Sequence, residues 1–410
     1  MDSAGAAEGI DLGALIRDNS LRIFKKDDSM YDIINAVLEH NVSEDPFFII
    51  DIGRVIRQYR RWTELLPAVE VFYAVKCNPN PLILRVLAGL GASFDCASKN
   101  EIAAAIAAGV DPSRIIFANP CKVSSHIKYA RGNDVDLLTF DSDQELYKVK
   151  LFHPHTSLLL RILVNDADSV CRFGTKFGAA GDEIAGLLAI AAALRLNVVG
   201  VSFHIGSGCR NAGRYEEAIA SARAAFRVAA DLGFAPTLLD IGGGFPGLED
   251  GPADDVSFEG IAAVVNRALE DHFADVPDLR VIAEPGRYVV ASSHTLVVNV
   301  INKKERRSED GEREFIYYLN DGIYGSFNCI MFDHAKPVVC PFNERDGQKY
   351  RSKLFGPTCD SIDLVADGVL LPELAIGEWA YVEGFGAYTT AAASGFNGFS
   401  NADAVYIMTC

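Results

Sequence analysis

The sequence predicts an α/β fold joined to an all-β domain: an N-terminal (β/α)8 TIM-like barrel followed by a C-terminal β-domain. Two patterns of apolar residues, one in each part of the chain, lead to this prediction. Short apolar runs alternate with alanine- and leucine-rich helical segments up to about residue 287, and after Tyr288 the apolar segments become short and alternating. The chain has 410 residues, more than one hydrophobic core usually holds, so two domains are expected.

Eight apolar runs have the lengths and spacing of barrel strands. They are residues 69–75, 93–95, 114–118, 135–139, 157–163, 199–203, 237–241 and 280–283. A doubly wound open sheet shares this alternation, but it would spread the polar residues that follow the strands along an edge. A barrel brings the carboxyl ends of all its strands to one mouth, where the active site lies. The polar residues at or near these ends are Lys76, Asp95, Asn119, Asp141, Arg161, His204, Gly242–Gly244 and Glu284.

The region after Tyr288 is predicted to form the strands of the second domain. Residues 295–301, 314–319, 336–340 and 378–383 are short apolar or alternating segments separated by Gly, Pro and Asp turns. We therefore expect the barrel to span residues 45–287 and the β-domain to span residues 288–410.

Composition narrows the possible partners and location. A net charge of -17 disfavours nucleic acid, because phosphates would be repelled. The longest apolar run, residues 184–194, is too short to cross a bilayer, and the N-terminus lacks the pattern of a signal peptide. Nine cysteines without a C-x-x-C pair favour a reducing cytosol and argue against a zinc ribbon. We expect a cytoplasmic protein without a metal site.

Lys76 is the most informative single residue. It ends the apolar run Val71–Val75, and a turn signal follows it at Cys77–Pro79. An amine that is partly desolvated by apolar neighbours stays nucleophilic, as a Schiff-base lysine must be. Taken alone, a lysine at a strand end is more often a solvated surface residue. The remaining motifs make the nucleophilic role the better interpretation.

Two glycine-containing loops predict a phosphate site. Asp240–Gly247 reads DIGGGFPG, and its glycines expose backbone N–H groups, although such a loop can also be a tight structural turn. Glu284–Arg287 reads EPGR and follows the next strand, so its glycine and arginine can complete the cradle. Barrels often bind phosphate beside their last two strands, which is where these loops lie.

Glu284 and His204 indicate which kind of phosphate-containing ligand the site would bind. A carboxylate at a phosphate site needs a positive partner, and a protonated pyridine nitrogen would provide one, as in pyridoxal phosphate enzymes. The alternative is a simple ion pair between Glu284 and Arg287. His204 precedes a Gly-Ser-Gly loop containing Ser207, which favours a ring stacked on a flat cofactor over a histidine buried in the core.

At this point the chain resembles the eukaryotic-type ornithine decarboxylases, pyridoxal 5'-phosphate enzymes with an alanine racemase-like fold. The resemblance rests on the ordered motifs YAVKCN, FDCASKNEI, HIGSGC, DIGGGFPG, EPGRY, NDGIYGSFNCIMFDHA, GPTCDSID and EGFGAYT. It implies that residues 1–44 join the β-domain. It also implies a homodimer with shared active sites at the subunit interface.

The resemblance also implies roles for individual residues. Lys76 would bind the cofactor covalently, His204 would stack on its ring, and Glu284 would pair with the ring nitrogen. Cys359 would donate a proton to the substrate, and Asp360 would act with it in the partner's site. The other cofactor contacts would be Asp95, Glu101, Arg161, Ser207, Gly244, Gly286, Arg287 and Tyr388, and the other substrate contacts Phe332 and Asp333. Phe332 departs from the family, where tyrosine is common at that position. Cys171–Lys176 also varies and receives no role.

The expected reaction is decarboxylation of L-ornithine to putrescine, a step of polyamine biosynthesis. Asp333 and Asp360 offer two carboxylates to a distal ammonium, which favours a basic amino acid. One methylene separates ornithine from lysine, and His334 after Asp333 favours ornithine within the family. A lysine or dual lysine/ornithine decarboxylase is one alternative, and a non-catalytic homologue like the antizyme inhibitors is another. A diaminopimelate decarboxylase is disfavoured because its C-E-S-G-D motif is absent.

Overall fold

The chain folds into two compact units, each described here by itself. In the computed structural model the described residues are 21–40, 43–248, 256–343, 345 and 347–410. The first unit is Ile56–Val289, and the second combines a segment ending at Val55 with Val290–Cys410. The boundary expected at residue 45 is displaced to Val55, because strand β2 (Phe47–Asp51) pairs within the second unit. Residues 1–20 of the expected N-terminal segment lie outside the described residues.

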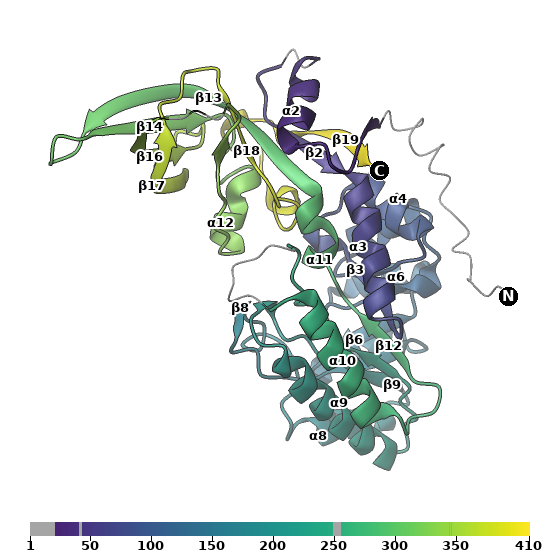
Figure 1. Ribbon diagram of the computed structural model, residues 1–410. Coiled ribbons are helices and arrows are strands. Elements are labelled where there is room, and N and C mark those ends of the chain that lie inside the picture. Colours follow the sequence, from purple (N-terminus) through teal and green to yellow (C-terminus); the bar gives the residue numbers. More distant parts are fainter. Residues whose placement is uncertain (1–20, 41–42, 249–255, 344, 346) are drawn as a thin grey trace. The chain divides into compact units, whose positions relative to one another are not determined.

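The first unit is a closed barrel of eight parallel strands (Figure 1). Each of the eight predicted runs forms one strand, so the prediction of a (β/α)8 barrel is confirmed. The last strand pairs with the first, Val281 lying beside Val69, which closes the sheet. The strands are β3 (Val69–Ala74), β4 (Ser93–Cys96), β5 (Ile115–Phe117), β6 (Leu137–Phe140), β7 (Ser157–Arg161), β9 (Asn197–Ser202), β11 (Leu238–Asp240) and β12 (Arg280–Ala283).

Helices follow the strands and carry recognisable start signals. Asn80 caps helix α4 (Pro81–Gly89), its side chain accepting hydrogen bonds from the N–H groups of Leu82 and Ile83, and Pro81 occupies the first turn. Ser98 and Ser257 cap two others in the same way. The helices are α3 (Ile52–Leu65), α4 (Pro81–Gly89), α5 (Lys99–Ala107), α6 (Ser124–Gly132), α7 (Asp143–Phe152), α8 (Ile184–Ala193), α9 (Gly213–Asp231), α10 (Phe258–Phe273) and α11 (Arg287–Val290).

Large apolar side chains fill the inside of the barrel. One buried cluster takes side chains from β3, β5, β7, β11 and β12, as expected for a barrel interior packed in layers. Its strand members are Phe72, Ile116, Leu159, Leu238 and Ile282. Because the interior is packed, polar chemistry is confined to the ends of the strands.

The second unit is built on a nine-stranded sheet. Its strands are β1 (Arg22–Phe24), β2, β13 (His294–Arg307), β14 (Arg313–Leu319), β15 (Cys340–Pro341), β16 (Lys349–Phe355), β17 (Leu364–Pro372), β18 (Trp379–Val382) and β19 (Asp403–Thr409). The strand predicted at residues 336–340 is wrong except for its last residue. Pro337 lacks a backbone N–H, and His334 just before it has a positive φ of 53°, which fits a turn better than a strand.

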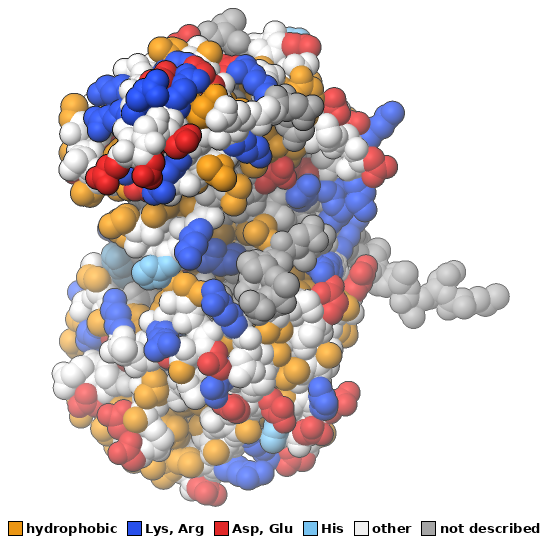
Figure 2. Space-filling model, turned by 60° about the vertical axis from the view of Figure 1, so that its left-hand side comes forward, with side chains coloured by type: hydrophobic (Ala, Val, Ile, Leu, Met, Phe, Trp, Pro, Cys, Tyr) orange, Lys and Arg blue, Asp and Glu red, His pale blue; other side chains and the backbone are white. Residues whose placement is uncertain are grey.

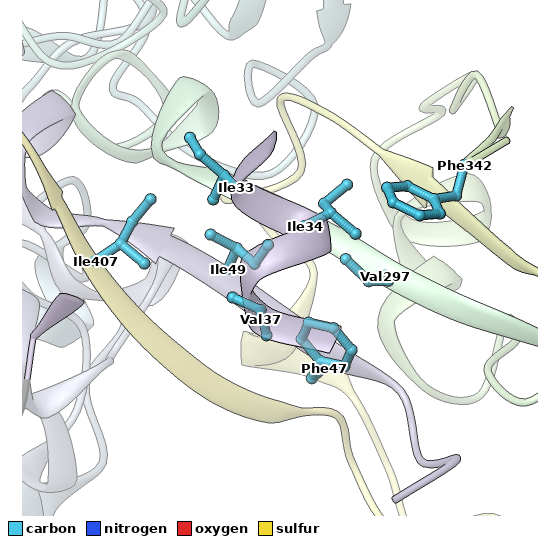
Figure 3. Packing of buried hydrophobic residues seen from close by; sticks show 8 residues of the cluster. All are labelled: Ile33, Ile34, Val37, Phe47, Ile49, Val297, Phe342 and Ile407. Carbon is cyan, nitrogen blue, oxygen red and sulfur yellow. The ribbon is translucent and has the colours of Figure 1, made fainter. Parts of the chain in front are cut away.

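An amphipathic helix covers part of this sheet. Helix α2 (Met30–Leu38) begins at Ser29, whose side chain accepts a hydrogen bond from the N–H of Asp32. Its buried face packs on side chains of β2, β13 and β19 (Figure 3). The cluster in the figure is Ile33, Ile34, Val37, Phe47, Ile49, Val297, Phe342 and Ile407. The N-terminal and C-terminal parts of the sequence are thus joined in one core.

The surface does not separate charges of opposite sign on the face shown in Figure 2, where Lys and Arg side chains are interspersed with Asp and Glu. None of the helices in the described part of the chain is both long enough and apolar enough to cross a membrane.

The barrel core yields a matched test of stability. Leu159 is fully buried in the cluster described above, whereas Leu151 at the end of α7 is 70% exposed. Leu159→Ala should lower the free energy of unfolding by about 2–5 kcal/mol, because it removes buried methyl groups and leaves a cavity. Leu151→Ala should change it by less than about 0.5 kcal/mol. Equal losses for the two variants, measured by urea denaturation, would contradict this packing.

Candidate functional site

Lys76 lies at the mouth of the barrel. It belongs to a 3-10 turn, η1 (Val75–Cys77), directly after β3, and its ammonium forms an ion pair with Asp95 at the end of β4. The Asp95 side chain is 1% exposed, whereas the Lys76 side chain is 38% exposed. Oδ1 of Asp95 is buried and has no hydrogen-bond partner among the described residues. Asp95 therefore holds the ammonium of a lysine whose side chain is still partly accessible to solvent.

Glu101 supports the loop that follows β4. Its Oε2 accepts a hydrogen bond of 2.6 Å from the N–H of Ala97, and its own N–H donates to the capping Ser98. Burial raises the pKa of the Glu101 carboxyl. This carboxyl thus fastens the end of β4 to the start of α5, beside Asp95.

His204 is a neutral imidazole with one fixed tautomer. Its Nδ1 accepts a hydrogen bond of 3.0 Å from the N–H of Gly206, so no proton is bound there. Burial, and then the positive charges of Arg161 and Lys76, hold the pKa of His204 well below its usual range. Its ring makes a T-shaped contact with the ring of Phe173, with 4.9 Å between ring centroids. The ring is thus oriented by two contacts and carries no charge.

Arg161, at the end of β7, places a guanidinium at the same mouth. It lies over the ring of Phe177 at 5.2 Å from the centroid, a cation–π contact. Its charge lowers the pKa of His204 and opposes the rise in the pKa of Glu284. Arg161 therefore influences both groups electrostatically.

Two residues predicted to bind phosphate lie together. The guanidinium of Arg287 donates a hydrogen bond of 3.1 Å to the hydroxyl of Ser207. Ser207 begins a short strand, β10 (Ser207–Cys209), that pairs with β8 (Ser169–Cys171). A guanidinium and a hydroxyl that lie 3.1 Å apart are both groups that can donate hydrogen bonds to an anion.

The glycines of the same region leave no room for side chains. Gly244 has φ +105°, and a Cβ there would lie 2.6 Å from the carbonyl oxygen of Gly206. A Cβ on Gly286 would lie 2.8 Å from Cβ of Cys77, the residue after Lys76. The glycines thus let the loops after β9, β11 and β12 and the Lys76 turn approach one another closely.

Glu284 follows β12 and is 7% exposed. Its N–H donates a 2.7 Å hydrogen bond to the carbonyl of Gly242. Burial and then the carboxyl of Asp240 raise the pKa of Glu284 well above its usual range, while Lys76 and Arg161 oppose the shift. A buried acid beside two cations can bind a protonated nitrogen of a ligand.

The second unit carries the remaining predicted residues. Cys359 is exposed, and its N–H donates to Oδ1 of Asn397, while Asp360 accepts a 2.6 Å hydrogen bond from the hydroxyl of Tyr324. Phe332 ends the short helix α12 (Cys329–Phe332), is 71% exposed and is followed by Asp333. Tyr388 has a positive φ of 56°.

Sequence reasoning missed Asp363, which shapes the loop that carries Cys359 and Asp360. The carboxyl of Asp363 is buried and accepts hydrogen bonds from the N–H groups of Ile323 and Thr358 and from the hydroxyl of Thr358. A Cβ on Gly356 would collide with this carboxyl at 2.3 Å. The motif GPTCDSID contains both residues, but only the folded loop shows that they are adjacent.

The Cys171–Lys176 segment, which received no role from the sequence, supports the His204 loop. Phe173 packs on His204, and Oδ2 of Asp166 accepts hydrogen bonds from the N–H groups of Phe173 and Gly174. The hydroxyl of Ser169 donates to the carbonyl of Ile205. A single aromatic residue in a loop gives no sequence signal of this contact.

Within the first unit, therefore, an accessible amine, a buried acid, a neutral imidazole and an anion-binding pair lie around one mouth. These groups fit a planar cofactor that carries an aldehyde, a ring nitrogen and a phosphate. The buried oxygen of Asp95 would gain a hydrogen-bond partner if a ligand presented a donor to it. The described residues contain no group of three or more His, Cys, Asp or Glu side chains that could hold a metal ion.

Comparison with known proteins points to the same chemistry. Residues 52–291 match the pyridoxal-binding domain of the pyridoxal-dependent decarboxylases. The chain is 48% identical over 390 residues to antizyme inhibitor 2 of Xenopus laevis, covering 93% of this chain and 85% of that one. It is 45% identical over 397 residues to ornithine decarboxylase of Rattus norvegicus, covering 94% and 85%.

Solved structures of decarboxylases share the fold. The arginine decarboxylase of Paramecium bursaria Chlorella virus superimposes with a TM-score of 0.87 at 36% identity, over 92% of this chain and all of that one. A lysine/ornithine decarboxylase from Vibrio vulnificus, complexed with putrescine, gives a TM-score of 0.82 at 33% identity, over 92% and 97%.

The anion pair can be tested by comparing two ligands that differ by a phosphate. Arg287→Met removes the guanidinium beside Ser207 and should weaken binding of pyridoxal 5'-phosphate about 10- to 100-fold, the range for one charge-assisted hydrogen bond. Binding of pyridoxal, which lacks the phosphate, should change by less than about threefold. A proportional loss for both ligands, measured by titration of the cofactor-free protein, would show that Arg287 does not bind the phosphate.

Proposed function

The chain belongs to the eukaryotic-type ornithine decarboxylase family of pyridoxal-dependent decarboxylases, and on this premise we propose that it decarboxylates L-ornithine to putrescine and carbon dioxide. The observation that supports catalysis best is the state of Lys76. Its side chain is 38% exposed at the mouth of the barrel although its partner Asp95 is buried. This combination leaves the lysine accessible to a ligand while a buried carboxylate fixes its position.

Pyridoxal phosphate, the cofactor of this family, supplies an electron-poor ring that stabilises the electron pair left at the substrate's α-carbon when carbon dioxide departs. In the proposal Lys76 holds the aldehyde carbon, and Glu284 faces the ring nitrogen. His204 presents an uncharged ring face. The phosphate is held by Ser207, Gly244, Gly286, Arg287 and Tyr388.

His204 can stack without competing for the charge at the ring nitrogen, because its own pKa is depressed. Asp95 holds Lys76 as a cation until the cofactor arrives. Arg161 places a positive charge opposite Glu284 and limits how far the pKa of that acid rises. Each of these effects is electrostatic and fixed before the substrate binds, which is the usual source of large rate enhancements.

The second unit supplies the substrate contacts in this proposal. Asp333 and Asp360 would bind the distal ammonium of the substrate, and Sγ of Cys359 would deliver a proton to the α-carbon. The exposed position of Cys359 and the exposed aromatic side chain of Phe332 support contact with a second subunit. We therefore propose a homodimer in which Cys359 and Asp360 complete the site of the partner, and a cytoplasmic location.

Two alternatives rest on specific observations. The identity of 48% to antizyme inhibitor 2 favours a binding protein without activity, but Lys76, Cys359 and Asp360 are all present. The likeness to a lysine/ornithine decarboxylase bound to putrescine leaves lysine as a second substrate. One methylene changes binding by only about 1–3 kcal/mol, so both diamino acids have to be compared directly.

Initial rates decide between these alternatives. We expect release of carbon dioxide from ornithine at a kcat/KM at least about tenfold above that for lysine, with arginine lower still. Lys76→Ala should abolish all three activities, because the amine that holds the cofactor is gone. Cadaverine formed faster than putrescine would indicate a lysine decarboxylase. No product from any substrate, in protein that binds the cofactor, would favour the binding homologue.

Mixing two inactive variants tests the shared site. Lys76→Ala and Cys359→Ala proteins are each expected to be inactive as homodimers. After subunits exchange at random, half of the dimers are hybrids with one intact site, so about one quarter of wild-type activity should return. Exchange without any recovery, verified by tagged subunits and mass spectrometry, would refute the shared-site arrangement.

A further inference from the structure

Asp240, at the end of β11, is a second buried acid beside Glu284. The exposed fractions of the two residues are 1% and 7%. The loop residue Gly242 fastens both: its N–H donates a 2.8 Å hydrogen bond to Oδ1 of Asp240, and its carbonyl accepts the N–H of Glu284. The two residues thus lie at the carboxyl ends of neighbouring barrel strands, β11 and β12, and share Gly242 as a hydrogen-bond partner.

The second carboxyl oxygen of Asp240 lacks a hydrogen-bond donor in the described part of the chain. Oδ2 of Asp240 is buried and has no hydrogen-bond partner among the described N–H and O–H groups. A hydrogen bond involving the Glu284 side chain acts to lower the pKa of Asp240, against the larger effect of burial. Carboxylate oxygens only accept hydrogen bonds, so contact between two carboxyls is favourable only when one of them carries a proton.

The charges around the pair favour one proton. The groups that act on Asp240 and Glu284 are Lys76 after β3, Asp95 on β4 and Arg161 on β7. His204, after β9, is neutral. With one proton on the acidic pair, the charges of these residues sum to zero, whereas full ionisation would leave one uncompensated negative charge in a buried site.

We propose that Asp240 and Glu284 share one proton and act as a single unit, with Asp240 a positioning residue that sets the proton affinity of the group facing the cofactor's ring nitrogen. The shared proton keeps the pair at a charge of minus one, while its position between the two carboxyls adjusts to the ligand. This deepens the role proposed above for Glu284 and rests on the cofactor site, not on the choice of substrate.

The titration behaviour of both groups agrees with this geometry. Burial raises the pKa of Asp240 to about 7, with Asp95 adding to the rise and the Gly242 N–H and Arg161 opposing it. Burial is also the main reason why the pKa of Glu284 is raised well above its usual range. Because the two carboxyls interact, their titration steps belong to the pair and not to either residue alone.

Infrared difference spectroscopy detects such a proton directly. A protonated carboxyl has a carbonyl-stretch band that an ionised carboxylate lacks. In cofactor-free full-length protein at about pH 8, wild type should show this band with the intensity of one carboxyl per chain. Asp321, whose pKa is raised by burial to about 6, is already ionised there, so Asp321→Asn serves as a matched control and should keep the band.

Asp240→Asn is the decisive variant. The amide keeps an acceptor for Gly242 and offers N–H donors to Glu284, so Glu284 can remain ionised and the band should disappear. Glu284→Gln should also remove the band, because it replaces the other carboxyl of the pair by an amide. Because either variant suffices, a failure of one to fold leaves the other to decide.

Two results would overturn the proposal. Wild-type protein without the band would show that both acids are ionised, and a band of full intensity in Asp240→Asn would show that the proton does not depend on this pair. Since the measurement needs no substrate, either result would leave the decarboxylase assignment untouched. Conversely, a protein that decarboxylated no substrate could still show the band of the shared proton.

Discussion

The closure of the barrel by the pairing of β12 with β3 is the constraint on which the site depends. That pairing brings the turn after β3, which carries Lys76, next to the segment after β12, which carries Glu284. A nucleophilic amine and an acid that lie more than 200 residues apart in sequence thereby reach the same mouth. The close approach at Gly286 and Cys77 shows how tight this junction is.

The mouth of the barrel also contains several buried charged side chains. Asp95, Asp240 and Glu284 are nearly inaccessible to solvent, and the cations Lys76 and Arg161 compensate them. Charges are costly to bury unless they are paired, so the arrangement favours a ligand that has complementary charges at fixed places. The same barrel also contains a buried pair with a structural role, Lys122 and Glu145, whose ammonium also donates to backbone carbonyls. Burial of a lysine alone does not mark a functional site.

The sequence predicted the barrel well because strand-forming runs and helix caps repeat in order, and each of the eight runs became a strand. It also predicted that Lys76, Asp95, His204 and Glu284 follow those strands, since strand order alone determines which residues reach the mouth. It failed where a contact depends on three-dimensional packing. Asp240 was taken as the start of a glycine loop, and neither the packing of Phe173 on His204 nor the carboxyl of Asp363 under the Cys359 loop has a sequence signal.

The central claim is that the Lys76 amine binds the aldehyde of the cofactor. The most direct test is reduction of the cofactor-loaded protein with borohydride, followed by proteolysis and mass spectrometry. A pyridoxyl phosphate group is expected on the peptide containing Lys76, and none in Lys76→Ala. Protein that acquires no bound chromophore with cofactor in excess, or that carries the label on another lysine, would contradict it.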